Sequence, residues 1–109
     1  ISQTTKRAES NMLASALQVG LVNKLRTVNP NLRDLGVKSA PFLVLVGAQA
    51  PSVLVELSFI SNVHDARLLK SDRYRALTSE GLLDGVLRYS QELKIDQRAS
   101  VPASIERIN

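Results

Sequence analysis

Apolar residues recur every three or four positions along the first quarter of the chain, which is the spacing of one face of an α-helix. The recurring positions are Leu13, Leu17, Leu21, Leu25 and Val28. They predict a helix over about residues 5–28 whose apolar face is directed to a core. We expect it to stop at Asn29-Pro30-Asn31, because proline disfavours helical geometry in the residue before it.

Two short apolar runs in the middle of the chain predict strands instead. Residues 42–46 read Phe-Leu-Val-Leu-Val, and residues 53–57 read Val-Leu-Val-Glu-Leu. Both runs have the length of a strand and contain β-branched side chains. Residues 47–51 join them, and this linker is long enough for either a tight connection or a bulged hairpin.

The chain after the second run predicts two helices. Asn62 is a favourable N-cap and Asp65 complements the helix dipole, which predicts a short helix over about residues 63–70. Ser71 caps a longer helix, whose apolar positions keep to one broad face as far as about Leu93. These positions are Tyr74, Leu77, Leu82, Val86, Tyr89 and Leu93.

Gly81 and Gly85 lie about one turn apart on that longer helix. In a membrane this spacing favours helix dimerisation, but here we expect it to mark a close packing point against the sheet. Beyond Leu93, residues 94–109 show mixed charge, small side chains and no period. They predict a tail or linker, so that residues 1–93 form the folded part.

A single carboxylate interrupts the second apolar run. An ionised side chain such as Glu56 in a buried strand has to be paired, bound to metal or placed in a cleft for chemistry. The alternative is an edge strand on which Glu56 faces water. The pattern of apolar residues leaves both interpretations open.

Composition narrows the class of protein. The 109 residues are 44% hydrophobic and 22% charged, and no apolar run approaches the roughly 18 residues that a membrane span requires. The net charge of +4 favours an anionic partner. Nucleic acid fits less well, because the basic residues are scattered and the aromatic residues are only two phenylalanines and two tyrosines. The absence of cysteine excludes thiolate zinc sites, disulfides and cysteine nucleophiles.

The motif Pro51-Ser-Val-Leu-Val-Glu-x-x-Phe-Ile-Ser-Asn62, followed by Leu68-Leu69 and Tyr74, resembles a known family. It is similar to the C-terminal half of the zinc-dependent N-acetylmuramoyl-L-alanine amidases, which cut the bacterial cell wall. Weaker matches come before it in the same order. They are Ser10-x-x-Leu-Ala14, Arg33-Asp-x-Gly-Val-Lys38 and Ala40-x-Phe-x-Val-Leu45.

This resemblance implies an α/β fold, a mixed sheet flanked by helices, of which the chain carries only the C-terminal strands and helices. It implies a hydrolase that cleaves the amide bond between N-acetylmuramic acid and L-alanine. Peptidoglycan is the implied partner, and an activator protein is a further one to test for. The implied location is the bacterial cell envelope, either the periplasm or the cell wall after secretion.

The resemblance also implies a role for Glu56. In the family, the glutamate of this strand stands beside zinc and serves the attacking water as general base. The zinc ligands of the family are two histidines and a glutamate upstream of the matched region, so we expect them upstream of Ile1 and expect no metal ligand in this chain. The single histidine, His64, cannot by itself form a three-ligand site, and we expect it to be exposed in a first helical turn.

Four further residues are weaker candidates for substrate binding. Arg33 and Lys38 would suit the carboxylates of the stem peptide, although charges in a loop are commonly solvated. Ser58 and Asn62 lie just past the predicted strand, where α/β folds build their ligand clefts. Capping or turn roles are the alternative for both.

The length of the chain suits one small domain and not two. The first residue is Ile1 rather than methionine, and the catalytic domain of the family is about twice the matched stretch. We therefore expect the second half of an amidase domain. The alternative is an independent domain that lost zinc and became a non-enzymatic wall-binding or regulatory module.

Overall fold

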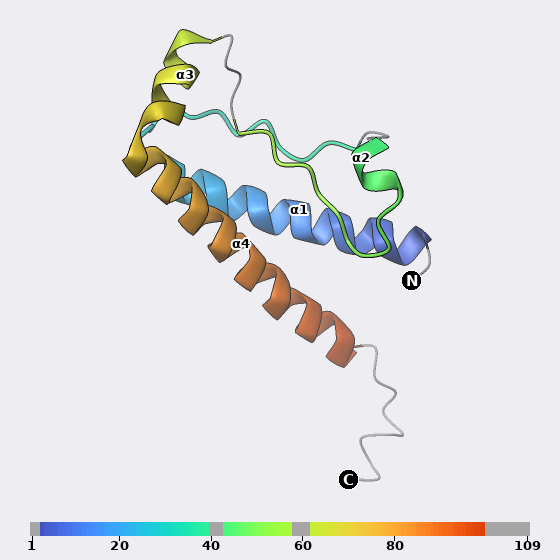
Figure 1. Cartoon of the computed structure of the whole chain (residues 1–109). Coiled ribbons are helices and arrows are strands. Elements are labelled where there is room, and N and C mark those ends of the chain that lie inside the picture. The colour runs from blue at the N-terminus through green and yellow to red at the C-terminus, as the bar shows by residue number, and fades with distance from the viewer. Residues whose placement is uncertain (1–2, 40–42, 58–61, 100–109) are drawn as a thin grey trace, which may run out of the picture.

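The computed structural model describes residues 3–39, 43–57 and 62–99, and the regular secondary structure of this part of the chain is helical. Its helices are α1 (Gln3–Leu25), α2 (Leu43–Val46), α3 (Val63–Lys70) and α4 (Asp72–Ala99). The two long helices, α1 and α4, pack together and diverge from the end at which α3 lies (Figure 1). Residues 32–39 and 51–57 run along α1 without regular secondary structure (Figure 1).

The first predicted helix is confirmed, with slightly different ends. Helix α1 stops at Leu25, and the next residues form a turn in which the Asn29 amide donates to the Leu25 carbonyl at 2.8 Å. The predicted apolar face is the buried one, since Leu17, Leu21 and Leu25 are each at most 7% exposed.

The glycines of α4 pack against another helix and not against a sheet. Gly81 and Gly85 face Gly20 of α1, and a Cβ atom added at Gly20 would lie 2.8 Å from the Gly85 nitrogen. Any side chain at this crossing would therefore meet backbone atoms of the partner helix. The spacing of the two glycines predicted a close contact correctly, but the expected partner was wrong.

The core lies where α1, α3 and the start of α4 meet. Leu21, Leu25 and Tyr74 form its buried centre. Leu68 of α3 packs on this cluster, and so does Val55 from the extended segment 51–57. One set of apolar contacts therefore ties the segment that carries Glu56 to the helices.

The predicted mixed sheet is wrong for the described residues, which contain no strand. Leu43–Val46 form the short helix α2 in place of a strand, and residues 53–57 lie in a segment without regular secondary structure. A strand needs a neighbour that accepts and donates its backbone hydrogen bonds. No segment of the described chain supplies that ladder, so the apolar runs lack the partner that would make them strands.

The caps predicted for the C-terminal helices are confirmed. The Asn62 Oδ1 atom accepts a hydrogen bond from the Asp65 amide at 3.1 Å, and the Ser71 Oγ atom accepts one from the Tyr74 amide at 3.3 Å. Helix α4 continues to Ala99, past the end predicted near Leu93. Residues 100–109 of the predicted tail lie outside the described part of the chain.

No helix in the described ranges is both long enough and apolar enough to cross a bilayer.

Asp34 links the segment of residues 32–39 to α1 through a hydrogen bond. Its Oδ1 atom accepts hydrogen bonds from Gln18 Nε2 at 2.7 Å and from the Gly36 amide at 2.9 Å, and Gly36 adopts φ of +76°. The hydrogen bond from Gln18, followed by that from Gly36, lowers the pKa of Asp34 from its ordinary value of 3.8.

We expect the hydrogen bond between Gln18 and Asp34 to weaken only at acidic pH, where the Asp34 carboxylate becomes protonated. A folded-state pKa below the unfolded value stabilises the fold above the unfolded pKa, and the effect is lost as pH falls through the folded pKa. In an NMR titration of the Asp34 carboxyl carbon, the midpoint should lie below 3.8 and should rise when Gln18 is replaced by alanine. An unchanged midpoint in Gln18→Ala would show that the hydrogen bond does not set the pKa.

Candidate functional site

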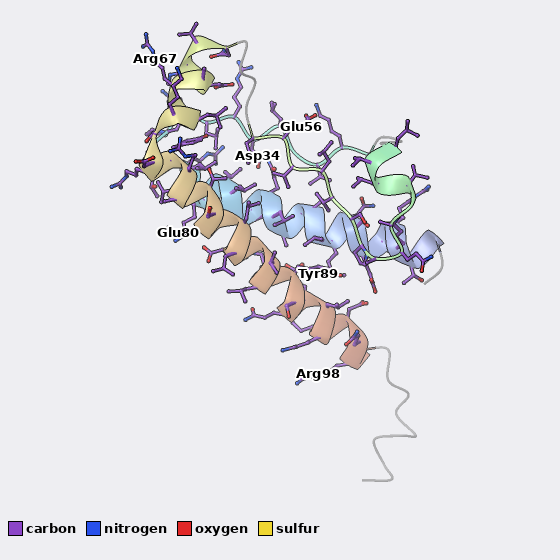
Figure 2. The ribbon with its side chains drawn as sticks, in the orientation of Figure 1. Asp34, Glu56, Arg67, Glu80, Tyr89 and Arg98 are labelled. Carbon is purple, nitrogen blue, oxygen red and sulfur yellow. The ribbon has the colours of Figure 1, made fainter. Side chains whose placement is uncertain are left out.

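Glu56 lies exposed on the outer side of the extended segment 51–57 (Figure 2). Val53 and Val55 are half-buried, and Val55 packs on the helical core, whereas Leu54 and Glu56 are exposed. The Ser52 amide donates a hydrogen bond to Ser10 Oγ of α1 at 2.9 Å. Glu56 is therefore an accessible carboxylate on a segment that is anchored at two points. Of the two interpretations that the sequence left open, the described residues agree with the one in which Glu56 faces water.

Arg33 and Lys38 lie exposed on the other extended segment. This segment is attached to α1 by the hydrogen bond between Gln18 and Asp34, and Figure 2 labels Asp34 and Glu56 on the two segments that run along α1. Both cations are accessible from solvent. They carry no hydrogen bond or ion pair to the rest of the described chain.

The remaining candidates have different outcomes. Asn62 uses its side-chain oxygen as the N-cap of α3, which agrees with the capping alternative. Ser58 lies outside the described residues. His64 is exposed in the first turn of α3, as predicted.

The described residues do not fit a metal centre. Within residues 3–39, 43–57 and 62–99, no three histidine, cysteine, aspartate or glutamate side chains are close enough to hold a metal ion. Catalytic zinc takes three protein ligands. A zinc-dependent reaction would therefore need ligands from outside this part of the chain.

Sequence reasoning missed an ion-pair cluster between the long helices. The Lys24 ammonium lies 3.7 Å from an Asp84 carboxylate oxygen and 4.0 Å from a Glu80 oxygen. All three groups are partly exposed, so the cluster adds little to stability. It joins α1 to α4 beside the glycine crossing, and only the pairing of the two helices reveals it.

The described residues thus show an exposed glutamate on one anchored segment and two exposed cations on the neighbouring segment. The sequence model of the N-acetylmuramoyl-L-alanine amidase family matches residues 1–88. The chain belongs to this family, as the motif around Glu56 predicted.

Curated relatives agree with this membership. The chain is 40% identical over 86 residues to N-acetylmuramoyl-L-alanine amidase LytC of Bacillus subtilis, covering 79% of this chain and 16% of LytC. It is 37% identical over 83 residues to amidase AmiC of Escherichia coli, covering 74% of this chain and 20% of AmiC. An uncharacterized B. subtilis protein, YqiI, is 41% identical over 80 residues, which are 73% of this chain and 36% of YqiI.

The chain thus spans at most 36% of the length of these three relatives. No solved structure matches it.

Proposed function

We propose that the whole protein carrying this chain hydrolyses the amide bond between N-acetylmuramic acid and L-alanine in peptidoglycan. The observation that carries the proposal is the family match over residues 1–88, which includes the motif around Glu56. The relatives LytC and AmiC bear the name of this activity. The bacterial cell envelope, either periplasm or cell wall, is where the enzyme would meet this polymer.

Glu56 is the general base in this proposal. Its carboxylate takes a proton from the water that attacks the amide carbonyl carbon, and delivers that proton to the nitrogen of L-alanine as the C–N bond breaks. Zinc, when bound, would polarise the carbonyl and acidify the water. The ligands of that zinc would come from residues outside the described part of the chain.

The exposed apolar side chains support a site completed by further structure. Leu43, Val44 and Val46 of α2 are 63 to 89% exposed, and Leu54 beside Glu56 is 44% exposed. Burying apolar surface stabilises a fold by roughly 25 cal/mol for each Å² that is removed from water, and these exposed side chains forgo that free energy. We propose that further residues of the whole protein cover these side chains and bring the zinc beside Glu56.

Substrate contacts are proposed for Arg33 and Lys38. Both are exposed on the segment beside that of Glu56, and both suit carboxylates of the stem peptide. Ser58 and Asn62 are weaker candidates, since Asn62 already caps α3.

The test is hydrolysis of purified peptidoglycan by the whole protein, with zinc content measured on the same sample. We expect new amino groups on L-alanine, about one zinc per chain, and loss of activity with a chelator that returns on addition of zinc. The absence of a ligand set in the described residues favours a second candidate, a non-enzymatic wall-binding or regulatory module. Binding of the polymer without release of amino groups would support that alternative.

A further inference from the structure

Four basic residues lie in the two helical turns that flank the junction of α3 and α4. Arg67 and Lys70 lie in the last turn of α3, and Arg73 and Arg75 lie in the first turn of α4. One residue separates the two helices. Figure 2 labels Arg67 at this end of the molecule and Arg98 at the opposite end of α4. We call Arg67, Lys70 and Arg73 the basic corner.

Arg75 is already engaged and is not part of the corner. Its guanidinium donates to the Leu69 carbonyl at 2.6 Å and pairs with Asp72. The three side chains of the basic corner are exposed and form no hydrogen bond or ion pair with the rest of the described chain. Charges that the fold leaves uncompensated are available to a partner.

The chemistry of the corner suits a polymer that carries carboxylates. Neighbouring like charges raise the local potential and attract a polyanion over about a Debye length, roughly 8–10 Å at moderate salt. The arginine guanidinium also matches the carboxylate group in shape and binds it through paired hydrogen bonds. A neutral or cationic partner would not offset the repulsion among the three positive charges of the corner.

The core ties the corner to the segment of Glu56. Val55, adjacent to Glu56, and Leu68, adjacent to Arg67, both pack against the buried cluster of Leu21, Leu25 and Tyr74. The segment of the catalytic candidate and the helix of Arg67 therefore pack on the same apolar cluster. A long polymer seated on the corner would stay within reach of Glu56.

We infer that the basic corner binds stem-peptide carboxylates of peptidoglycan and retains the polymer while the amide is cut. This inference rests on the proposed function, which makes peptidoglycan the substrate. It differs from that proposal because the corner acts in binding, and its loss would leave the chemical step intact.

The experiment measures binding separately from turnover. The whole protein carrying Glu56→Gln is cosedimented with purified peptidoglycan from which phosphate-bearing polymers have been stripped. The corner variant adds Arg67→Gln, Lys70→Gln and Arg73→Gln. The control variant removes the same charge from exposed positions further along α4, namely Arg88→Gln, Lys94→Gln and Arg98→Gln.

The corner variant should bind about tenfold more weakly at low salt. Each exposed ion pair contributes less than a tenfold gain in affinity, and the variant removes three of them. The control variant should lose less than about twofold, and at about 1 M salt the difference should disappear. A variant with Arg67→Lys and Arg73→Lys keeps the charge but loses the paired hydrogen bonds, so it should bind more weakly than its parent and more tightly than the corner variant. Thermal unfolding verifies that each variant is folded.

Equal losses in the corner and control variants would overturn the inference, since net charge alone would then explain binding. Unchanged binding in the corner variant would also overturn it. Binding seen only when phosphate-bearing polymers are present would assign the corner to those polymers instead. Hydrolysis is measured in a separate assay on the protein with Glu56 intact. Loss of hydrolysis there would contradict the proposed function, whereas the binding assay alone decides this inference.

Discussion

Replacing Glu56 with glutamine in the whole protein should lower the turnover of purified peptidoglycan by at least about a hundredfold. Glutamine keeps the size and shape of the side chain but cannot take a proton from water. The side chain is exposed on a segment anchored through Ser52 and Val55, so the substitution should leave the fold intact. Zinc content should remain at about one per chain, because Glu56 is proposed as the base and not as a ligand.

A matched control separates this effect from a general loss of negative charge. Glu92 is an exposed glutamate on α4, and Glu92→Gln removes the same charge without touching the candidate site. Its turnover should stay within about twofold of the parent protein. If Glu56→Gln kept activity within a factor of about three, Glu56 would not be the catalytic base.

The helices could be predicted from the sequence because their determinants are local. The cap at Asn62, the cap at Ser71 and the apolar spacing of α1 act within a few residues of one another, and all three are confirmed by the structure. The strands could not be predicted on the same basis. The runs 42–46 and 53–57 have the composition of strands, but a strand exists only where a second chain segment completes its hydrogen bonds.

In the candidate site, too, the features set by nearby residues were predictable, whereas those set by distant parts of the structure were not. The motif around Glu56 was sufficient to identify the family, and it placed Asn62 and His64 correctly at the start of α3. Its apolar neighbours left open whether Glu56 is buried or faces water, and the structure shows an exposed side chain. Burial depends on what covers Leu54 and Glu56, and the described residues supply no such cover.

The crossing of α1 and α4 should tolerate no side chain at Gly20. A Cβ atom there would lie 2.8 Å from the Gly85 nitrogen and 3.2 Å from the Gly85 Cα atom. These are backbone atoms, which cannot rotate away as the end of a flexible side chain can. The helices would have to separate, and the leucine contacts beside the crossing would loosen.

Gly20→Ala should therefore destabilise the fold by about 2 kcal/mol or more, although alanine gains up to about 1 kcal/mol over glycine in helix propensity. For a domain of this size, that loss lowers the melting temperature by roughly 10 °C. Gly85→Ala should behave similarly, because its Cβ atom would lie 2.6 Å from the Leu17 Cα atom. Gly81→Ala should be milder, since its nearest contacts are at 3.0 Å.

Gly47→Ala is the control for this series. A Cβ atom at Gly47 meets nothing within 4 Å, so the substitution should change the free energy of unfolding by less than about 0.5 kcal/mol. Thermal and denaturant unfolding of the four variants would measure the ranking. A Gly20→Ala protein as stable as Gly47→Ala would mean that the helices do not meet at their glycines. The arrangement of α1 and α4 that positions both Glu56 and the basic corner would then have to be revised.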